Sequence, residues 1–122
     1  MNCLLITKSG QNEAEIIPFL RVNDVDYVLT HDQLFGIEKA HEYTFDVVVV
    51  DMLDNGFQID KTIRILKDCN PHVRIIVRTD YNSRELETLV RKESVFYYHV
   101  NSFGNQDFTS ALSAALELNK DL

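Results

Sequence analysis

The chain has 122 residues, of which 45% are hydrophobic and 25% are charged, and its formal net charge is -7. This composition is typical of one compact domain with a hydrophobic core, so we treat residues 1–122 as a single domain. The acidic balance and the scattered basic residues argue against direct nucleic-acid binding, because phosphate contacts need clustered lysines and arginines. No apolar stretch has the length of a membrane span and no secretory signal is visible, so we expect a cytoplasmic protein that does not bind membranes.

Apolar runs of strand length alternate along the chain with segments of helical periodicity. The expected strands cover residues 3–6, 27–29, 47–50, 73–77 and 95–100, and the expected helices cover residues 13–20, 32–42, 59–66, 83–92 and 107–118. Strands that alternate with crossover helices are mostly parallel, with helices on both faces of the sheet. The sequence therefore predicts an α/β fold, a flavodoxin-like, doubly wound sheet of five parallel strands in the order 2-1-3-4-5, with five helices.

Two details of the expected helices are specific enough to test. Asp32 and Ser83 stand where an N-cap is expected, and both residue types accept hydrogen bonds from the first turn of a helix. Within residues 32–42, Leu34, Ile37 and Ala40 recur at helical spacing, which predicts that they form the apolar face of that helix.

A single carboxylate marks the expected site. Asp51 follows four consecutive valines, and a carboxylate is costly to bury, so we expect it at the carboxyl end of a central strand. In the order 2-1-3-4-5, ligands approach the tips of the first and third strands. Those tips carry residues 7–9 and Asp51.

Three segments resemble the receiver domains of response regulators. Residues 45–51, FDVVVVD, resemble the third strand with its phosphoacceptor aspartate, and residues 75–79, IIVRT, resemble the fourth strand with its switch threonine. Residues 97–103, YYHVNSF, are similar to the fifth strand, which normally ends in Lys-Pro-Phe. The resemblance implies that Asp51 occupies the phosphoacceptor position, Thr79 and Tyr98 the switch positions, and that the chain is a signalling domain and not an enzyme.

The departures from this pattern concern the chemistry of the site. The acidic pair that holds Mg²⁺ in the family is replaced by Thr7 and Lys8, and the lysine and proline that follow the fifth strand are replaced by Asn101 and Ser102. Mg²⁺ prefers oxygen ligands and a neighbouring ammonium repels it. We therefore expect no metal site, no cofactor and no catalytic residue, but an atypical pseudo-receiver that signals through protein–protein interaction without standard Mg²⁺-dependent phosphorylation.

Lysine offers a substitute for the metal. Our hypothesis is that the side chain of Lys8 forms an ion pair with Asp51 and holds the pocket in one state; the alternative is that Lys8 points into solvent. Asp54 and Asp80 also stand near the expected pocket, where they either form with Asp51 an acidic cluster that binds a cation, or face water.

The resemblance also suggests partners. A histidine kinase or an output protein would bind the domain, and two copies would pair through the fourth helix, the fifth strand and the fifth helix. The second interpretation is a receiver that is still phosphorylated at Asp51 by a histidine kinase through an altered site. A third is a pocket at the strand tips that binds a flavin or another small anionic ligand, with Thr7 as a hydrogen-bond donor.

Overall fold

The computed structural model describes residues 1–8, 13–52, 58–80 and 82–118, and all structural statements below concern these residues. Strands and helices alternate along the chain. The strands are β1 (Asn2–Ile6), β2 (Asp26–Thr30), β3 (Val47–Asp51), β4 (Arg74–Thr79) and β5 (Tyr97–Val100), and the helices are α1 (Glu13–Val22), α2 (Gln33–Glu42), α3 (Ile59–Cys69), α4 (Arg84–Arg91), the short 3-10 helix η1 (Asn101–Phe103) and α5 (Asn105–Ala115).

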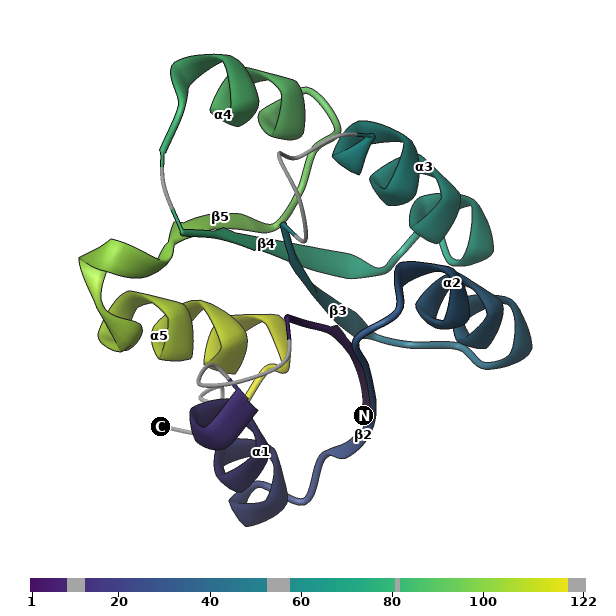
Figure 1. The fold of residues 1–122 in the computed structure, drawn as a ribbon. Coiled ribbons are helices and arrows are strands. Elements are labelled where there is room, and N and C mark those ends of the chain that lie inside the picture. The colour runs from purple at the N-terminus through teal and green to yellow at the C-terminus, as the bar shows by residue number, and fades with distance from the viewer. Residues whose placement is uncertain (9–12, 53–57, 81, 119–122) are drawn as a thin grey trace.

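The five strands form one parallel sheet in the order β2-β1-β3-β4-β5, which confirms the predicted topology. Helices α1 and α5 cover one face, and α2, α3 and α4 cover the other (Figure 1). Both faces are buried because the side chains of β3 alternate between two apolar clusters. Val48 and Val50 belong to the cluster under α2, α3 and α4, while Val47 and Val49 belong to the cluster under α1 and α5.

The helix caps are those expected from the sequence. The side chain of Asp32 accepts a hydrogen bond from the backbone N–H of Leu34 at 3.0 Å, and the Ser83 hydroxyl accepts one from Leu86 at 3.4 Å. These bonds satisfy N–H groups that have no partner within the helix, and so they fix where α2 and α4 begin.

The apolar face of α2 differs in part from the prediction: Ala40 is buried as expected, Ile37 is half-buried, and Leu34 is exposed. Leu34 is 66% exposed, and the residues of α2 that are buried are Gly36 and Ala40. A β-carbon on Gly36 would lie 2.6 Å from Cδ1 of Ile6, so the helix approaches β1 closely only because a glycine stands there. The helix therefore packs through its small residues and leaves the larger Leu34 outside.

Several element ends also differ from the predicted ones. Helix α3 continues to Cys69, β5 begins at Tyr97, and α5 begins at Asn105 after the η1 turn. The backbone N–H of Phe96 also donates to the carbonyl of Ile75 at 2.8 Å, so hydrogen bonding to β4 begins one residue before Tyr97. Among the described residues, no helix is long and apolar enough to cross a membrane.

Candidate functional site

Asp51 lies at the carboxyl end of β3, where the sequence places it, and it is almost completely buried. It is 2% exposed and stands directly opposite Arg78 in the register of β3 and β4. Because neighbouring residues in register point to the same face of a sheet, both side chains leave the sheet on the side of α1 and α5.

Arg78 binds both oxygens of this carboxylate. Its Nε lies 2.6 Å from Oδ1 of Asp51 and its Nη2 lies 2.9 Å from Oδ2, which is the bidentate geometry that the planar guanidinium favours. Arg78 is itself only 3% exposed, and its Cζ lies 4.8 Å from the centre of the Phe108 ring of α5. The buried negative charge at the centre of the site is therefore neutralised by an arginine from the neighbouring strand.

Lys8 also contacts Asp51, but through its backbone. The N–H of Lys8 donates to Oδ2 of Asp51 at 3.2 Å, while its side-chain Nζ lies 2.8 Å from Oδ2 of Asp80. The hypothesis of a Lys8–Asp51 side-chain ion pair is therefore wrong, and so is the alternative in which the lysine only faces solvent. The lysine side chain reaches the tip of β4, because the carboxylate of Asp51 is already occupied by Arg78.

Asp80 connects the tips of three strands. Its Oδ2 accepts from Lys8 after β1, and its Oδ1 accepts from the side-chain amide of Asn101, at 2.9 Å, after β5. The hydrogen bond from Lys8, followed by that from Asn101, holds the pKa of the Asp80 carboxyl below its ordinary value. The side chains of Lys8 and Asp80 are 41% and 53% exposed, so this second set of contacts lies at the surface, outside the buried Asp51–Arg78 pair.

The remaining two positions that depart from the receiver pattern, Thr7 and Ser102, differ in burial. Thr7 is buried, and its backbone N–H donates to the carbonyl of Thr30, which continues the pairing of β1 with β2. Ser102 is exposed in the η1 turn. Asp54 lies outside the described residues, and within those residues no group of three acidic, cysteine or histidine side chains is placed to hold a metal ion.

Both switch positions are buried. Thr79 is 2% exposed at the end of β4, and Tyr98 is 6% exposed on β5. The Tyr98 hydroxyl donates to Oδ1 of Asn82 at 3.4 Å, and the Arg91 guanidinium of α4 lies 5.9 Å from the centre of its ring. Burial, and then the charge of Glu87, raises the pKa of the tyrosine above its ordinary value. Tyr98 is therefore held beneath α4.

Sequence reasoning missed two buried polar residues beside Asp51. Arg78 lies within residues 75–79, which resemble the fourth strand of receiver domains, but the sequence reasoning assigned no role to its charge. His99 of β5 stands opposite Arg78, is 1% exposed, and neither of its ring nitrogens has a hydrogen-bond partner among the described residues. The available signal was the alternation of the strands, which places the side chains of residues 51, 78 and 99 on one face.

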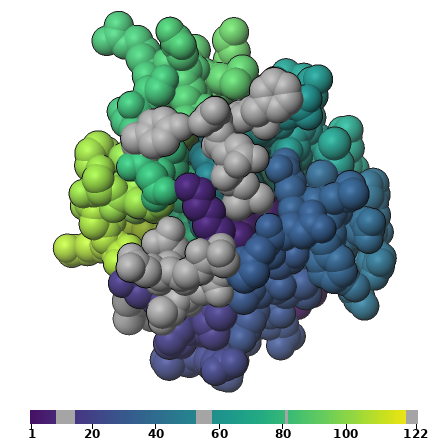
Figure 2. Space-filling view, in the orientation of Figure 1, coloured from purple at the N-terminus to yellow at the C-terminus, as the bar shows by residue number. Residues whose placement is uncertain are grey.

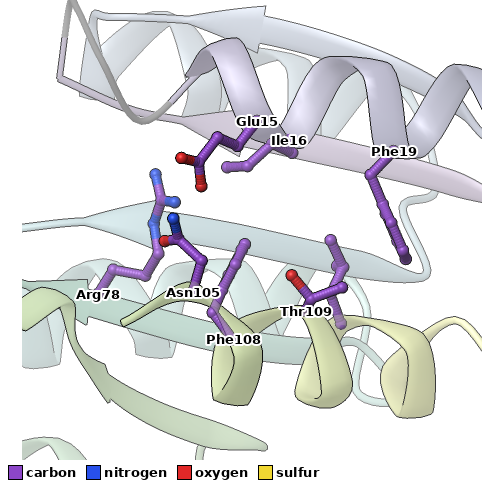
Figure 3. Close-up of a pocket in the computed structure, with 8 residues that line it drawn as sticks. Glu15, Ile16, Phe19, Arg78, Asn105, Phe108 and Thr109 are labelled. Carbon is purple, nitrogen blue, oxygen red and sulfur yellow. The ribbon is translucent and has the colours of Figure 1, made fainter. Parts of the chain in front are cut away.

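A small pocket lies beside this row, between α1 and α5. Figure 3 shows the polar ends of Glu15, Arg78 and Asn105 at one side of the pocket and the apolar side chains of Ile16 and Phe108 along it. Its free volume is about 10 Å³, which is enough for about one water molecule.

The end of the N-terminal segment is visible on one face of the molecule. In Figure 2 this segment, in purple, reaches the surface between the green part of the chain that contains α4 and the blue part that contains α2. Lys8 follows β1 directly, and its ammonium pairs with Asp80 after β4.

No protein-family model and no curated protein matches the sequence. Solved structures do match the fold: a response regulator receiver domain from Clostridium thermocellum is 23% identical, with a TM-score of 0.75 and coverage of 98% of this chain and 96% of that chain. A CheY-like receiver domain from Methanospirillum hungatei is 12% identical, with a TM-score of 0.82 and the same coverages.

A third structure is a response regulator from Burkholderia pseudomallei with a phosphorylated aspartic acid and a calcium ion. It is 21% identical, with a TM-score of 0.77, and the match covers 98% of this chain and 71% of that one. These likenesses agree with the strand order and with the helices on both faces of the sheet. The chain therefore has the fold of response-regulator receiver domains.

Proposed function

We propose that this chain is an atypical receiver domain that acts in signal transduction through protein–protein contacts, without standard Mg²⁺-dependent phosphorylation of Asp51. The observation that carries the proposal is the buried, bidentate pair between Asp51 and Arg78. The fold supports the class of protein, and the pair supports the departure from the usual chemistry.

Phosphorylation of a carboxylate requires one of its oxygens to approach the phosphoryl group in line, while a metal neutralises the charge on the transferring group. Here both oxygens of Asp51 accept hydrogen bonds from Arg78, and Oδ2 also accepts one from the backbone of Lys8. Freeing an oxygen would leave a buried guanidinium without its partner, which is energetically costly. The residues at the tip of β1, Thr7 and Lys8, also supply no carboxylate for a metal.

The surface formed by α4, β5 and α5 is the proposed contact with a partner, either a histidine kinase, an output protein or a second copy of the chain. Phe96 before β5 and Phe103 after it are 43% and 69% exposed. Exposed aromatic side chains with polar neighbours are enriched in protein interfaces. Tyr98 lies under α4, so a change in its position would alter this same surface.

The second candidate function is phosphorylation of Asp51 by a histidine kinase through an altered site. It is favoured by the position of Asp51 at the carboxyl end of β3 and by the matching response regulator whose structure contains a phosphorylated aspartic acid. In this case Arg78 would have to move away from the carboxylate before the reaction.

The two candidates differ in their response to a small phosphodonor. The protein is incubated with acetyl phosphate and Mg²⁺ and its intact mass is measured, beside a receiver domain that keeps the complete acidic site as a positive control. We expect no gain of a phosphoryl group. A gain that disappears in Asp51→Asn would establish the second candidate and refute the first.

The proposed contact surface has its own test. Sedimentation velocity compares the unmodified chain with Phe103→Ser and with Leu34→Ser, a control that removes an exposed apolar side chain from α2. We expect self-association that is weakened by the change at Phe103 alone. Equal weakening by both changes, or a monomer at all concentrations, contradicts pairing of two copies through this surface.

A further inference from the structure

A second pocket lies at the opposite end of the sheet from Asp51. It is lined by the first residues of β1 and β2 and by side chains around the end of α2, namely Asn2, Asp26, Tyr27, Val28, Tyr43 and Phe45. Its volume is about 160 Å³, which is enough for one long side chain. None of these residues contributes to the contacts of Asp51, so the pocket is a separate feature of the molecule.

Aromatic rings form much of this pocket. Tyr43 and Phe45 meet edge to face, with ring centres 6.4 Å apart. Tyr27 also borders the pocket, but its side chain packs with the cluster under α1 and α5. Aromatic rings attract cations to their faces. Tyr43 already does so within the chain, because Nζ of Lys39 lies 5.7 Å from the centre of its ring.

A carboxylate stands beside the rings. Asp26 is exposed, and its carboxylate takes part in no hydrogen bond or ion pair with any residue that the structure describes. Asp24 and Arg21 stand on the adjoining surface, which shares Asp26 and Tyr27 with the pocket. Aromatic walls with an unpaired carboxylate suit a ligand with an apolar stem and a positive end, as in the side chains of arginine and lysine.

The pocket lies along the free edge of the sheet. Among the described strands, β2 pairs with β1 alone. On that side the N–H of Asp26 donates to the carbonyl of Met1, and the carbonyl of Thr30 accepts from the N–H of Thr7. Because main-chain groups alternate in direction along a strand, those of Tyr27 and Leu29 point away from the sheet. An edge of this kind can accept an extended segment of another protein as an added strand.

We propose that the β2 edge binds an extended, basic segment of a partner protein, which pairs with Tyr27 to Leu29 and places an arginine or lysine side chain in the pocket beside Asp26. Charge complementarity supports a basic partner, since the chain has a formal charge of -7. The same charge opposes the pairing of two copies through this edge.

The test uses two capped peptides that differ at one position, acetyl-Val-Thr-Arg-Val-Thr-amide and the same peptide with citrulline in place of arginine. Citrulline keeps the shape of arginine but removes the charge. Each peptide is titrated into the ¹⁵N-labelled full chain and followed by NMR. We expect the arginine peptide to shift the amides of Tyr27 and Leu29, and to bind about fivefold more tightly than the citrulline peptide.

Variants separate the pocket from general charge attraction. Asp26→Asn and Tyr43→Ala are expected to weaken the arginine peptide to the affinity of the citrulline peptide. Asp107→Asn removes the same charge from an exposed position on α5 and is expected to leave binding unchanged. Far-ultraviolet circular dichroism verifies that each variant is folded.

Several results would overturn the proposal. These are the absence of shifts at millimolar peptide, equal binding of the two peptides, equal effects of the Asp26 and Asp107 changes, or shifts confined to α4 and α5. Binding of acetyl-arginine amide as tight as that of the peptide would show a site for small cations and refute strand addition. The proposal does not depend on the phosphorylation of Asp51, so either can fail without the other.

Discussion

Arg78 and Asp51 face each other across β4 and β3, and each is the main charged partner of the other in the interior of the protein. Removing two charges from water has a large cost, which their attraction and the two hydrogen bonds offset only while both are present. The pair therefore makes each residue dependent on the other.

Replacing Arg78 alone is expected to be strongly destabilising. Arg78→Met leaves the buried carboxylate of Asp51 unpaired, which lowers the free energy of unfolding by about 3–5 kcal/mol. Urea unfolding at neutral pH measures this change. The double variant Asp51→Leu with Arg78→Met removes both charges and is expected to recover most of the loss; a double variant as unstable as the single one would show that the pair is not the cause.

The surface contacts of Asp80 with Lys8 and Asn101 are expected to contribute much less to stability than the buried pair. Lys8→Gln removes the ammonium that pairs with Asp80, and because both side chains are substantially exposed, water and salt screen the interaction. We expect the free energy of unfolding to fall by less than about 1 kcal/mol in the same urea experiment. A loss as large as that of Arg78→Met would mean that the surface contacts, and not the buried pair, hold the strand tips together.

We expect that Mg²⁺ does not bind specifically beside Asp51. In a titration followed by NMR, millimolar Mg²⁺ should leave the amides of Lys8, Asp51 and Met52 unshifted, because the carboxylate of Asp51 is bound by a guanidinium. The sodium salt at equal ionic strength serves as the control. Saturable shifts at these amides would show that the metal displaces Arg78.

Acid should destabilise the protein through His99. Burial, and then the nearby charge of Arg78, lowers the pKa of this imidazole below its ordinary value of 6.5. The unfolded chain consequently binds a proton more readily than the folded one, and stability falls as the pH drops below about 6.5, by up to about 1.4 kcal/mol per pH unit. Above that pH the histidine is neutral in both states and has no such effect.

Urea unfolding at pH 7.5 and pH 5.5 measures the contribution of His99. His99→Phe keeps an aromatic ring beside Phe108 and should reduce the loss of stability between the two pH values, while His72→Gln, at an exposed position, should not. The prediction is wrong if both variants respond to pH like the unmodified chain.

The fold could be predicted because its signals are local and repeated. Apolar runs such as the four valines of β3 alternate with segments of helical period, and this alternation leaves few topologies for the sheet. The tip of β3 was also the correct place for Asp51. For the apolar face of α2, the prediction was correct for Ala40 and wrong for Leu34, because tight packing against β1 favours Gly36, a choice that hydrophobicity does not indicate.

The internal pairing of the site could not be predicted in the same way. Lys8 and Arg78 are both basic residues near Asp51, and the choice between them depends on which residue is opposite Asp51 in the sheet. That register is not encoded in the spacing of apolar residues. The ammonium of Lys8 binds the carboxylate of Asp80 at the surface. This contact also depends on two strand tips lying close together in the fold, which the sequence does not show.

The links among Lys8, Asp80 and Asn101 have a consequence for redesign of the strand tips. An acid at position 8 would face Asp80, and a lysine at position 101 would join the same carboxylate while Arg78 still bound Asp51. Rearranging the charges around Asp51 therefore requires replacements at several strand ends at once, with Arg78 among them.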